Sequence, residues 1–152
     1  MNIVKPSSFT GSNWPKCSFF AVYDGHGGCL CADFLRDNLH HFIIKNPKFP
    51  KNPKEAIEEG FEAAEKEFIN NYSLNSLKSE IIDKSGSCAI ITLIIEDVCY
   101  IANVGDSRAV ISKNGGSIFS PLTVDHKPND ENESKRIVDN GGKVYQYKFC
   151  II

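Results

Sequence analysis

The amino-acid sequence predicts an α+β domain in which helices pack on one face of a mainly antiparallel β-sheet. Three observations predict it. An apolar strand precedes two amphipathic helices, three β-rich runs follow with short connections, and a capped helix comes near the end. The chain has 152 residues, of which 41% are hydrophobic and 24% charged, so one domain with a sizeable core is expected. Residues 1–16 are rich in Ser, Asn and Pro, and we expect them to be irregular.

The first half of the chain contains one strand and two helices. Cys17–Tyr23 is apolar and aromatic, which predicts a buried strand. Apolar residues spaced three to five apart over Gly28–Lys45 predict a helix with one apolar face. Asn52 is suited to cap a second helix, with Pro53 as its first residue and an apolar stripe that reaches Tyr72. Four large residues on these stripes are expected to be core rather than binding residues: Phe34, Leu39, Phe61 and Phe68.

The second half begins with three β-rich runs, Cys88–Ile95, Val98–Val104 and Ala109–Lys113. The segments between them are two to four residues long, which implies antiparallel neighbours. Asn114–Gly116 is a turn signal after the third run. We therefore expect a meander of three strands.

The last part of the sequence predicts a helix and a strand. Asn129 or Asp130 is suited to cap the helix, which should run to about Asn140 and stop at Gly141. Lys143–Phe149 has the composition of one more strand.

Composition excludes several classes of function. The net charge is −2 and the isoelectric point about 6.1, so nothing favours nucleic acid or an anionic membrane as a partner. The longest apolar run, Ala89–Ile95, is too short to span a bilayer, and no secretory leader is evident. We expect a cytoplasmic or nuclear protein whose six cysteines are reduced and mostly buried. Cys29 and Cys31 lack the second pair that a zinc site requires.

Asp24-Gly25-His26 is the first candidate for chemistry, because it follows the predicted buried strand. Asp24 offers hard oxygen ligands for Mg²⁺ or Mn²⁺, Gly25 can present its carbonyl, and His26 can transfer a proton near neutral pH. The bland alternative is a turn, since Asp-Gly is a common turn dipeptide.

Two further polar motifs have bland alternatives of their own. Gly105–Arg108 places a carboxylate, Asp106, at the end of a strand, but it also fits a hairpin turn with a solvated Arg108. Asp125–Pro128 gathers an acid, an imidazole and an ammonium before the last helix, but it also fits a polar capping loop. His40 and His41, at the end of the first helix, are expected to be solvated or favourably placed by the helix dipole.

The ordered set of motifs resembles the 2C-type metal-dependent protein serine/threonine phosphatases. The resemblance covers about residues 17–144, so 1–152 is interpreted as one partial phosphatase domain. Its motifs are Phe19–Gly28, Ser85–Ala89, Ala102–Ala109, Leu122–Pro128, Glu133 with Arg136 and Ile137, and Gly141-Gly142 with Val144.

The resemblance implies a fold, a reaction and a set of site residues. The family fold is an antiparallel β-sandwich flanked by helices, which holds two Mg²⁺ or Mn²⁺ ions and hydrolyses phosphoserine and phosphothreonine in protein substrates. By resemblance Asp24 bridges both metals and Gly25 ligates one through its carbonyl. His26 protonates the leaving oxygen, and Asp106 is an auxiliary ligand or lies just outside the metal centre.

The sequence also departs from the family pattern. The family has an arginine and an acidic pair ahead of the first motif, but residues 1–16 contain no Arg, Asp or Glu. Its two later metal-binding aspartates would lie beyond Ile152, and Cys88 replaces a threonine. We therefore expect a fragment truncated at both ends that binds metal weakly, does not turn over substrate alone and risks association through exposed sheet edges.

A second hypothesis remains, that of a degenerate phosphatase fold that binds partners or regulates without catalysis. Asp24, His26 and Asp106 favour the enzyme, because a purely structural module has no need of them at strand ends.

Overall fold

A computed structural model of the protein describes residues 15–74 and 84–146. Its principal sheet contains β1 (Cys17–His26), β2 (Gly86–Ile95) and β3 (Val98–Val104), with β2 in the centre and both pairings antiparallel. The predicted strand positions and their antiparallel arrangement are confirmed. The expected α+β class is confirmed as well, although β1 continues three residues beyond its predicted end.

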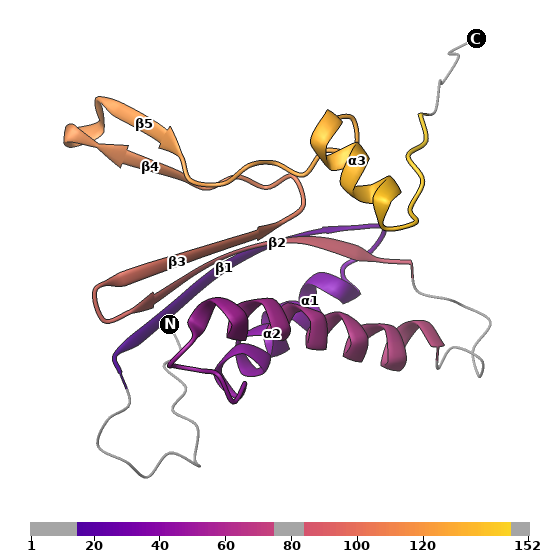
Figure 1. Ribbon diagram of the computed structural model, residues 1–152. Coiled ribbons are helices and arrows are strands. Elements are labelled where there is room, and N and C mark those ends of the chain that lie inside the picture. The colour runs from indigo at the N-terminus through magenta and orange to yellow at the C-terminus, as the bar shows by residue number, and fades with distance from the viewer. Residues whose placement is uncertain (1–14, 75–83, 147–152) are drawn as a thin grey trace.

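Two helices, α1 (Leu30–Ile44) and α2 (Pro53–Phe68), lie together on one face of this sheet (Figure 1). Alternate residues of β2 face the helices, so Ala89, Ile91 and Leu93 are almost fully buried. The predicted core residues are confirmed: three are buried and Phe61 is half-buried against the same cluster. The helices contribute the following buried side chains: Phe34, Leu39, Ile43, Ala56, Ile57, Ala64 and Phe68.

The helix ends differ from expectation in detail. Pro53 is the first residue of α2, as predicted, but the Asn52 side chain donates to the Glu55 carboxylate at 2.6 Å and caps no backbone amide. A π-helical turn, η1 (Ile69–Leu74), follows α2. Tyr72 lies in that turn, and its ring packs 5.1 Å from Phe68, which keeps the predicted apolar stripe intact.

The third predicted β-run does not extend the meander, and this expectation was wrong. β4 (Val110–Lys113) pairs instead with β5 (Ile118–Pro121), a strand that sequence patterns did not reveal. The predicted turn is confirmed between them as the short 3₁₀ segment η3 (Asn114–Gly116). Within the described ranges this hairpin does not pack on the three-stranded sheet, so the expected sandwich is incomplete there and Phe20 and Val22 remain exposed.

The last helix, α3 (Glu131–Asp139), begins where predicted. The Asp130 side chain accepts hydrogen bonds from the amides of Asn132 and Glu133 at 3.0 and 3.2 Å. None of its residues is buried. The expected strand over 143–149 is absent from its described part, residues 143–146, and 147–149 lie outside the described residues.

Other expectations concern side chains and membranes. The five described cysteines are free thiols, as expected, and Cys150 lies outside the described residues. The expectation that most cysteines are buried was wrong for these five, since Cys29 and Cys99 are exposed and the other three are half-buried. His40 and His41 are half-buried, with ring centroids 4.1 Å apart, so the expectation of solvated imidazoles was wrong. His41 does occupy the last turn of α1. No helix found in residues 15–74 and 84–146 is long and apolar enough to cross a membrane.

Candidate functional site

The Asp24–His26 segment is the last part of β1. Its residues pair in antiparallel register with Gly86–Cys88 of β2, and all three are exposed. The bend follows at Gly27–Cys29 and leads directly into α1. The motif therefore lies at the end of a strand, as expected, but its Asp-Gly pair is not the turn of the bland alternative. A paired strand holds these polar groups more firmly than a free loop does.

Gly86 makes room for the His26 imidazole. A Cβ atom added at position 86 would lie 2.5 Å from His26 Nε2 and 3.0 Å from its Cε1. No carbon atom tolerates such an approach, so a side chain at 86 would push the ring away. The presence of glycine in the Ser85-Gly86-Ser87 motif is thus explained by the space that the His26 ring needs at the end of the sheet.

Cys88 connects the end of β1 to the segment that follows β3. Its Cα is the register partner of Asp24, and its thiol donates to Asp106 Oδ1 at 3.2 Å. Partial burial raises the pKa of Cys88, and the negative charges of Asp106 and Asp24 add to that increase. The neutral thiol thus donates to Asp106, and its residue is paired in register with Asp24, so both aspartates lie at the same end of the sheet.

Gly105 lets the chain leave the sheet beside Cys88. Its φ of +103° suits glycine, and a Cβ there would lie 2.4 Å from Cys88 Sγ. The Gly105 carbonyl accepts hydrogen bonds from the His126 amide at 2.9 Å and from Asn103 Nδ2 at 3.0 Å. Gly105–Ser107 is therefore not the hairpin turn of the bland alternative but the start of a crossing to the second sheet.

Arg108 is tied to Asp125, contrary to the alternative of a purely solvated cation. Its Nε and one terminal nitrogen contact the two Asp125 oxygens at 2.9 and 2.8 Å, and Lys127 Nζ adds a contact at 3.1 Å. Hydrogen bonds from these two cations lower the pKa of Asp125 to about 2. The bidentate pair joins the segment after β3 to the segment before α3.

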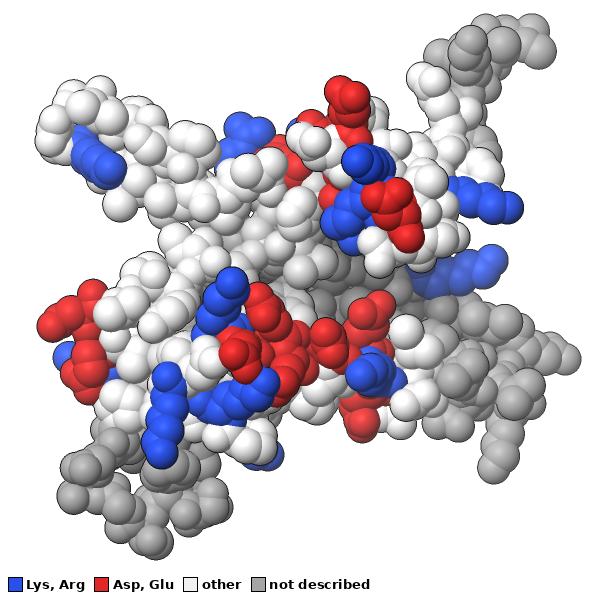
Figure 2. All heavy atoms as spheres, viewed as in Figure 1, with Lys and Arg blue, Asp and Glu red and all other residues white. Residues whose placement is uncertain are grey.

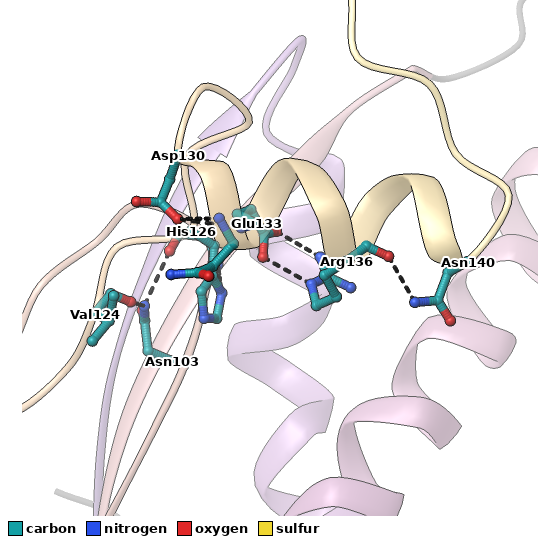
Figure 3. Close-up of polar contacts among 9 residues, drawn as sticks. Asn103, Val124, His126, Asp130, Glu133, Arg136 and Asn140 are labelled. Carbon is teal, nitrogen blue, oxygen red and sulfur yellow. Dashed lines mark hydrogen bonds and ion pairs between the residues drawn. The ribbon is translucent and has the colours of Figure 1, made fainter.

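Figure 3 shows how α3 lies over this junction. Asn103 donates to the carbonyl of Val124 at 3.3 Å, which holds the segment before the helix against the end of β3. On the helix, Glu133 and Arg136 form a bidentate pair at 2.6 and 2.8 Å that lies on the same side as His126. The hydrogen bonds from Arg136 lower the pKa of Glu133.

The donors at the sheet end have the right chemical type for a hard divalent cation. Asp24 and Asp106 supply exposed carboxylates, and Gly25 supplies a backbone carbonyl. Within the two described stretches, however, no three side chains of His, Cys, Asp or Glu are arranged to hold a metal ion. These residues therefore fit part of a Mg²⁺ or Mn²⁺ centre and fall short of the ligands that two ions need.

The fold thus brings the candidate residues Asp24, Gly25, His26 and Asp106 to one end of the principal sheet. Sequence reasoning missed two contributors there, the thiol of Cys88 and the space left by Gly86. The available signal for Cys88 was its departure from the family's usual threonine. Its partner Asp106 is 18 residues away, a contact that required the strand register.

Comparisons with known proteins give a consistent picture. The family model described as Protein phosphatase 2C matches residues 3–151. Over 135 residues the chain is 42% identical to a protein of Oryza sativa subsp. japonica named Probable protein phosphatase 2C 55, and the match covers 89% of this chain and 34% of that protein. A Caenorhabditis elegans protein named a probable protein phosphatase 2C is 42% identical over 131 residues, which cover 86% of this chain and 35% of the other.

Solved structures agree on the fold. The serine-threonine phosphatase 2C of Toxoplasma gondii aligns with a TM-score of 0.67 at 23% identity, covering 84% of this chain and 46% of that one. A C. elegans sex determining protein aligns with a TM-score of 0.68 at 27% identity, covering 87% and 32%. The chain spans about a third of the length of the curated relatives it matches.

Proposed function

The chain belongs to the protein phosphatase 2C family, and we propose on that basis that it forms part of the active site of a metal-dependent protein serine/threonine phosphatase. The proposed reaction is hydrolysis of phosphoserine and phosphothreonine in protein substrates. One observation carries the proposal: the Asp24–His26 strand end lies beside Cys88, whose thiol holds the Asp106 carboxylate. Two carboxylates, a carbonyl and an imidazole at one end of the sheet supply part of what metal-assisted phosphate hydrolysis needs.

Asp24, the Gly25 carbonyl and Asp106 are the proposed ligands for Mg²⁺ or Mn²⁺. Such ions, when bound as a pair, supply a water molecule of lowered pKa and neutralise charge on the phosphate. Asp24 extends from a paired strand, so its oxygens have a fixed origin from which to ligate. Cys88 orients Asp106 by its hydrogen bond, since no other partner of that carboxylate is found in the described part of the chain.

His26 is the proposed acid. When the P–O bond to the serine or threonine breaks, the leaving oxygen needs a proton, and an exposed imidazole can carry one near neutral pH. Its ring is held over Gly86, where no side chain displaces it. Its position one residue beyond the Gly25 carbonyl places the proton donor beside the proposed ligands.

We also propose that the 152-residue chain alone has little or no activity. The support is the ligand count, because two hexacoordinate ions need more carboxylates than Asp24 and Asp106 provide. The same count keeps the alternative open that the fold binds phosphoproteins or partners without hydrolysis.

A chimera tests the function. Residues 17–144 would replace the matching segment of the rice relative, and Mn²⁺-dependent release of phosphate from a phosphothreonine peptide would be measured. We expect turnover that Asp24→Asn abolishes and His26→Ala lowers by about 10²–10⁴-fold, the usual contribution of a general acid. A chimera that folds and binds metal but shows no turnover would contradict the proposal that these residues belong to a phosphatase active site. It would favour the alternative of a non-catalytic binding protein. If the unmodified 152-residue chain is active and Asp24→Asn abolishes that activity, the proposal that this chain is inactive by itself is contradicted, but the proposed phosphatase reaction is not.

A further inference from the structure

Asn103 is a polar side chain on the face of the principal sheet that carries the candidate site. It lies opposite Ile90 in the pairing of β2 with β3, and Cys88, on the same side of β2 as Ile90, lies opposite Asp24. Side chains alternate between the two faces of a strand, and Ala89 is buried against the helices. Asn103, Cys88 and Asp24 therefore share the face opposite α1 and α2.

The Asn103 amide holds two backbone carbonyls. Its Nδ2 donates to the Gly105 carbonyl at 3.0 Å and to the Val124 carbonyl at 3.3 Å, the second of which is drawn in Figure 3. Two neighbouring carbonyl oxygens favour a single orientation of the amide, because Oδ1 in place of Nδ2 would repel both. The side chain thus joins the end of β3 to the segment before α3.

The first of these contacts bears directly on Asp106. The Gly105 carbonyl belongs to the peptide plane that leads into Asp106, so holding its oxygen fixes the direction in which the Asp106 backbone begins. Glycine has no Cβ to limit its torsions, and Gly105, at φ +103°, needs such contacts to keep one conformation. From that direction the Asp106 carboxylate reaches Cys88 Sγ, which lies 3.2 Å from Oδ1.

The other polar atom of the same amide counts against a role in stability. Asn103 Oδ1 is buried and finds no donor within the described part of the chain. A buried acceptor without a partner lowers stability, and asparagine is disfavoured in strands. Leucine has a similar size and would remove this unpaired atom. The Gly105 carbonyl would still accept from the His126 amide at 2.9 Å, and Val124 is an exposed residue whose carbonyl water can reach.

We infer that Asn103 is a positioning residue for Asp106, and that it serves the direction of that carboxylate rather than the stability of the chain. It is not itself one of the proposed ligands. It acts by holding the peptide group through which Asp106 is attached. The inference deepens the proposed function and rests on it for the role of Asp106 as a ligand of Mg²⁺ or Mn²⁺.

The variant Asn103→Leu in the full 152-residue chain separates positioning from stability. Urea unfolding should show that it is at least as stable as the unaltered chain. In EDTA, nuclear Overhauser contacts between Cys88 and Asp106 should weaken, because the Gly105 carbonyl has lost one of its two donors.

Metal binding is measured with Mn²⁺ alone, by the broadening of the amide signals of residues 24–26. Asn103→Leu should need about 10–100-fold more Mn²⁺ for half-maximal broadening, the usual effect of losing a group that orients a ligand. Figure 2 shows acidic side chains gathered over α2, where Mn²⁺ can also bind, so only signals from the strand end are compared.

Two comparisons locate the effect. Asn38→Leu removes a similar half-buried amide, which donates to the Phe34 carbonyl at 2.8 Å in α1, and it should leave Mn²⁺ binding at the strand end unchanged. Asp106→Asn should weaken Mn²⁺ binding by itself. Adding Asn103→Leu to Asp106→Asn should weaken binding no further, because the carboxylate that Asn103 positions is already gone.

Unchanged Mn²⁺ binding in Asn103→Leu, a further loss in the double variant, or a clear decrease in the stability of Asn103→Leu would overturn the inference. Failure of the proposed function looks different. Asp106→Asn would then bind Mn²⁺ as the unaltered chain does, while Asn103→Leu would still weaken the contact between Cys88 and Asp106 in EDTA.

Discussion

At Gly60, helix propensity and tertiary packing are expected to change the free energy of unfolding in opposite directions when the glycine is replaced with alanine. Replacing a helical glycine with alanine normally stabilises a protein by about 1 kcal/mol. Gly60, however, is buried on α2 where that helix meets α1. A Cβ at position 60 would lie 2.6 Å from Ile43 Cγ1 and 3.2 Å from both the Cα and the N of Ile43.

The size of the effect follows from those contacts. Overpacking a core typically costs about 1–3 kcal/mol, and the upper value applies because two of the three crowded atoms are backbone. Ile43 is itself 0% exposed and belongs to the buried core, so its displacement would disturb neighbouring core side chains. Subtracting the propensity gain of about 1 kcal/mol leaves Gly60→Ala destabilised by about 2 kcal/mol. For a chain of this size that lowers Tm by roughly 4–8 °C.

Urea unfolding of the 152-residue chain, followed by circular dichroism, measures this. The difference between Glu62→Gly and Glu62→Ala, at an exposed position of the same helix, gives the propensity term without crowding. In a double-mutant cycle, Ile43→Ala should recover about 1–2 kcal/mol of the Gly60→Ala loss, because it removes Cγ1. A Gly60→Ala chain as stable as the unaltered chain, or more stable, would show that α1 and α2 do not approach this closely.

Three further predictions concern pH and capping. Hydrogen bonds from Arg108 and Lys127 lower the pKa of Asp125 to about 2, below its unfolded value of about 3.9. Its contribution to stability is thus present above pH 3.9 and lost as the pH falls towards 2. In Asp125→Asn the urea midpoint should depend less on pH over that window. The same dependence on pH in the variant and the unaltered chain would contradict the pairing. Burial, and then the charge of the neighbouring histidine, lower the pKa of His40, so stability should decrease as the pH falls below about 6.5. That decrease in stability should be smaller in His40→Gln. An equal decrease in the variant would mean that a group other than His40 causes the loss of stability. Finally, Asp130→Ala should remove a cap worth about 1 kcal/mol and speed amide exchange in α3 about fivefold while α2 exchanges as before; equal rates in α3 would mean that the cap contributes nothing.

Local patterns in the sequence were sufficient for most of the individual elements. The apolar periodicity of residues 30–44 and 53–68 and the cap at Asp130 depend on neighbours within one or two helical turns. Strand composition and the Asn114–Gly116 turn are local as well. The candidate residues Asp24, Gly25, His26 and Asp106 were found from short motifs for the same reason, because each motif is continuous in the chain.

Pairing and site assembly depended on contacts between distant residues. β4 pairs with β5 rather than β3 because the chain at Gly105 leaves the sheet, and that departure depends on a backbone approach to Cys88. Composition alone does not report this, since Gly105-Asp106-Ser107 is equally suited to a hairpin. The hydrogen bond from Cys88 to Asp106 and the space for His26 over Gly86 likewise arise from strand register. Residue types and local turns thus predicted the parts and the family, whereas the long-range register determined which parts meet.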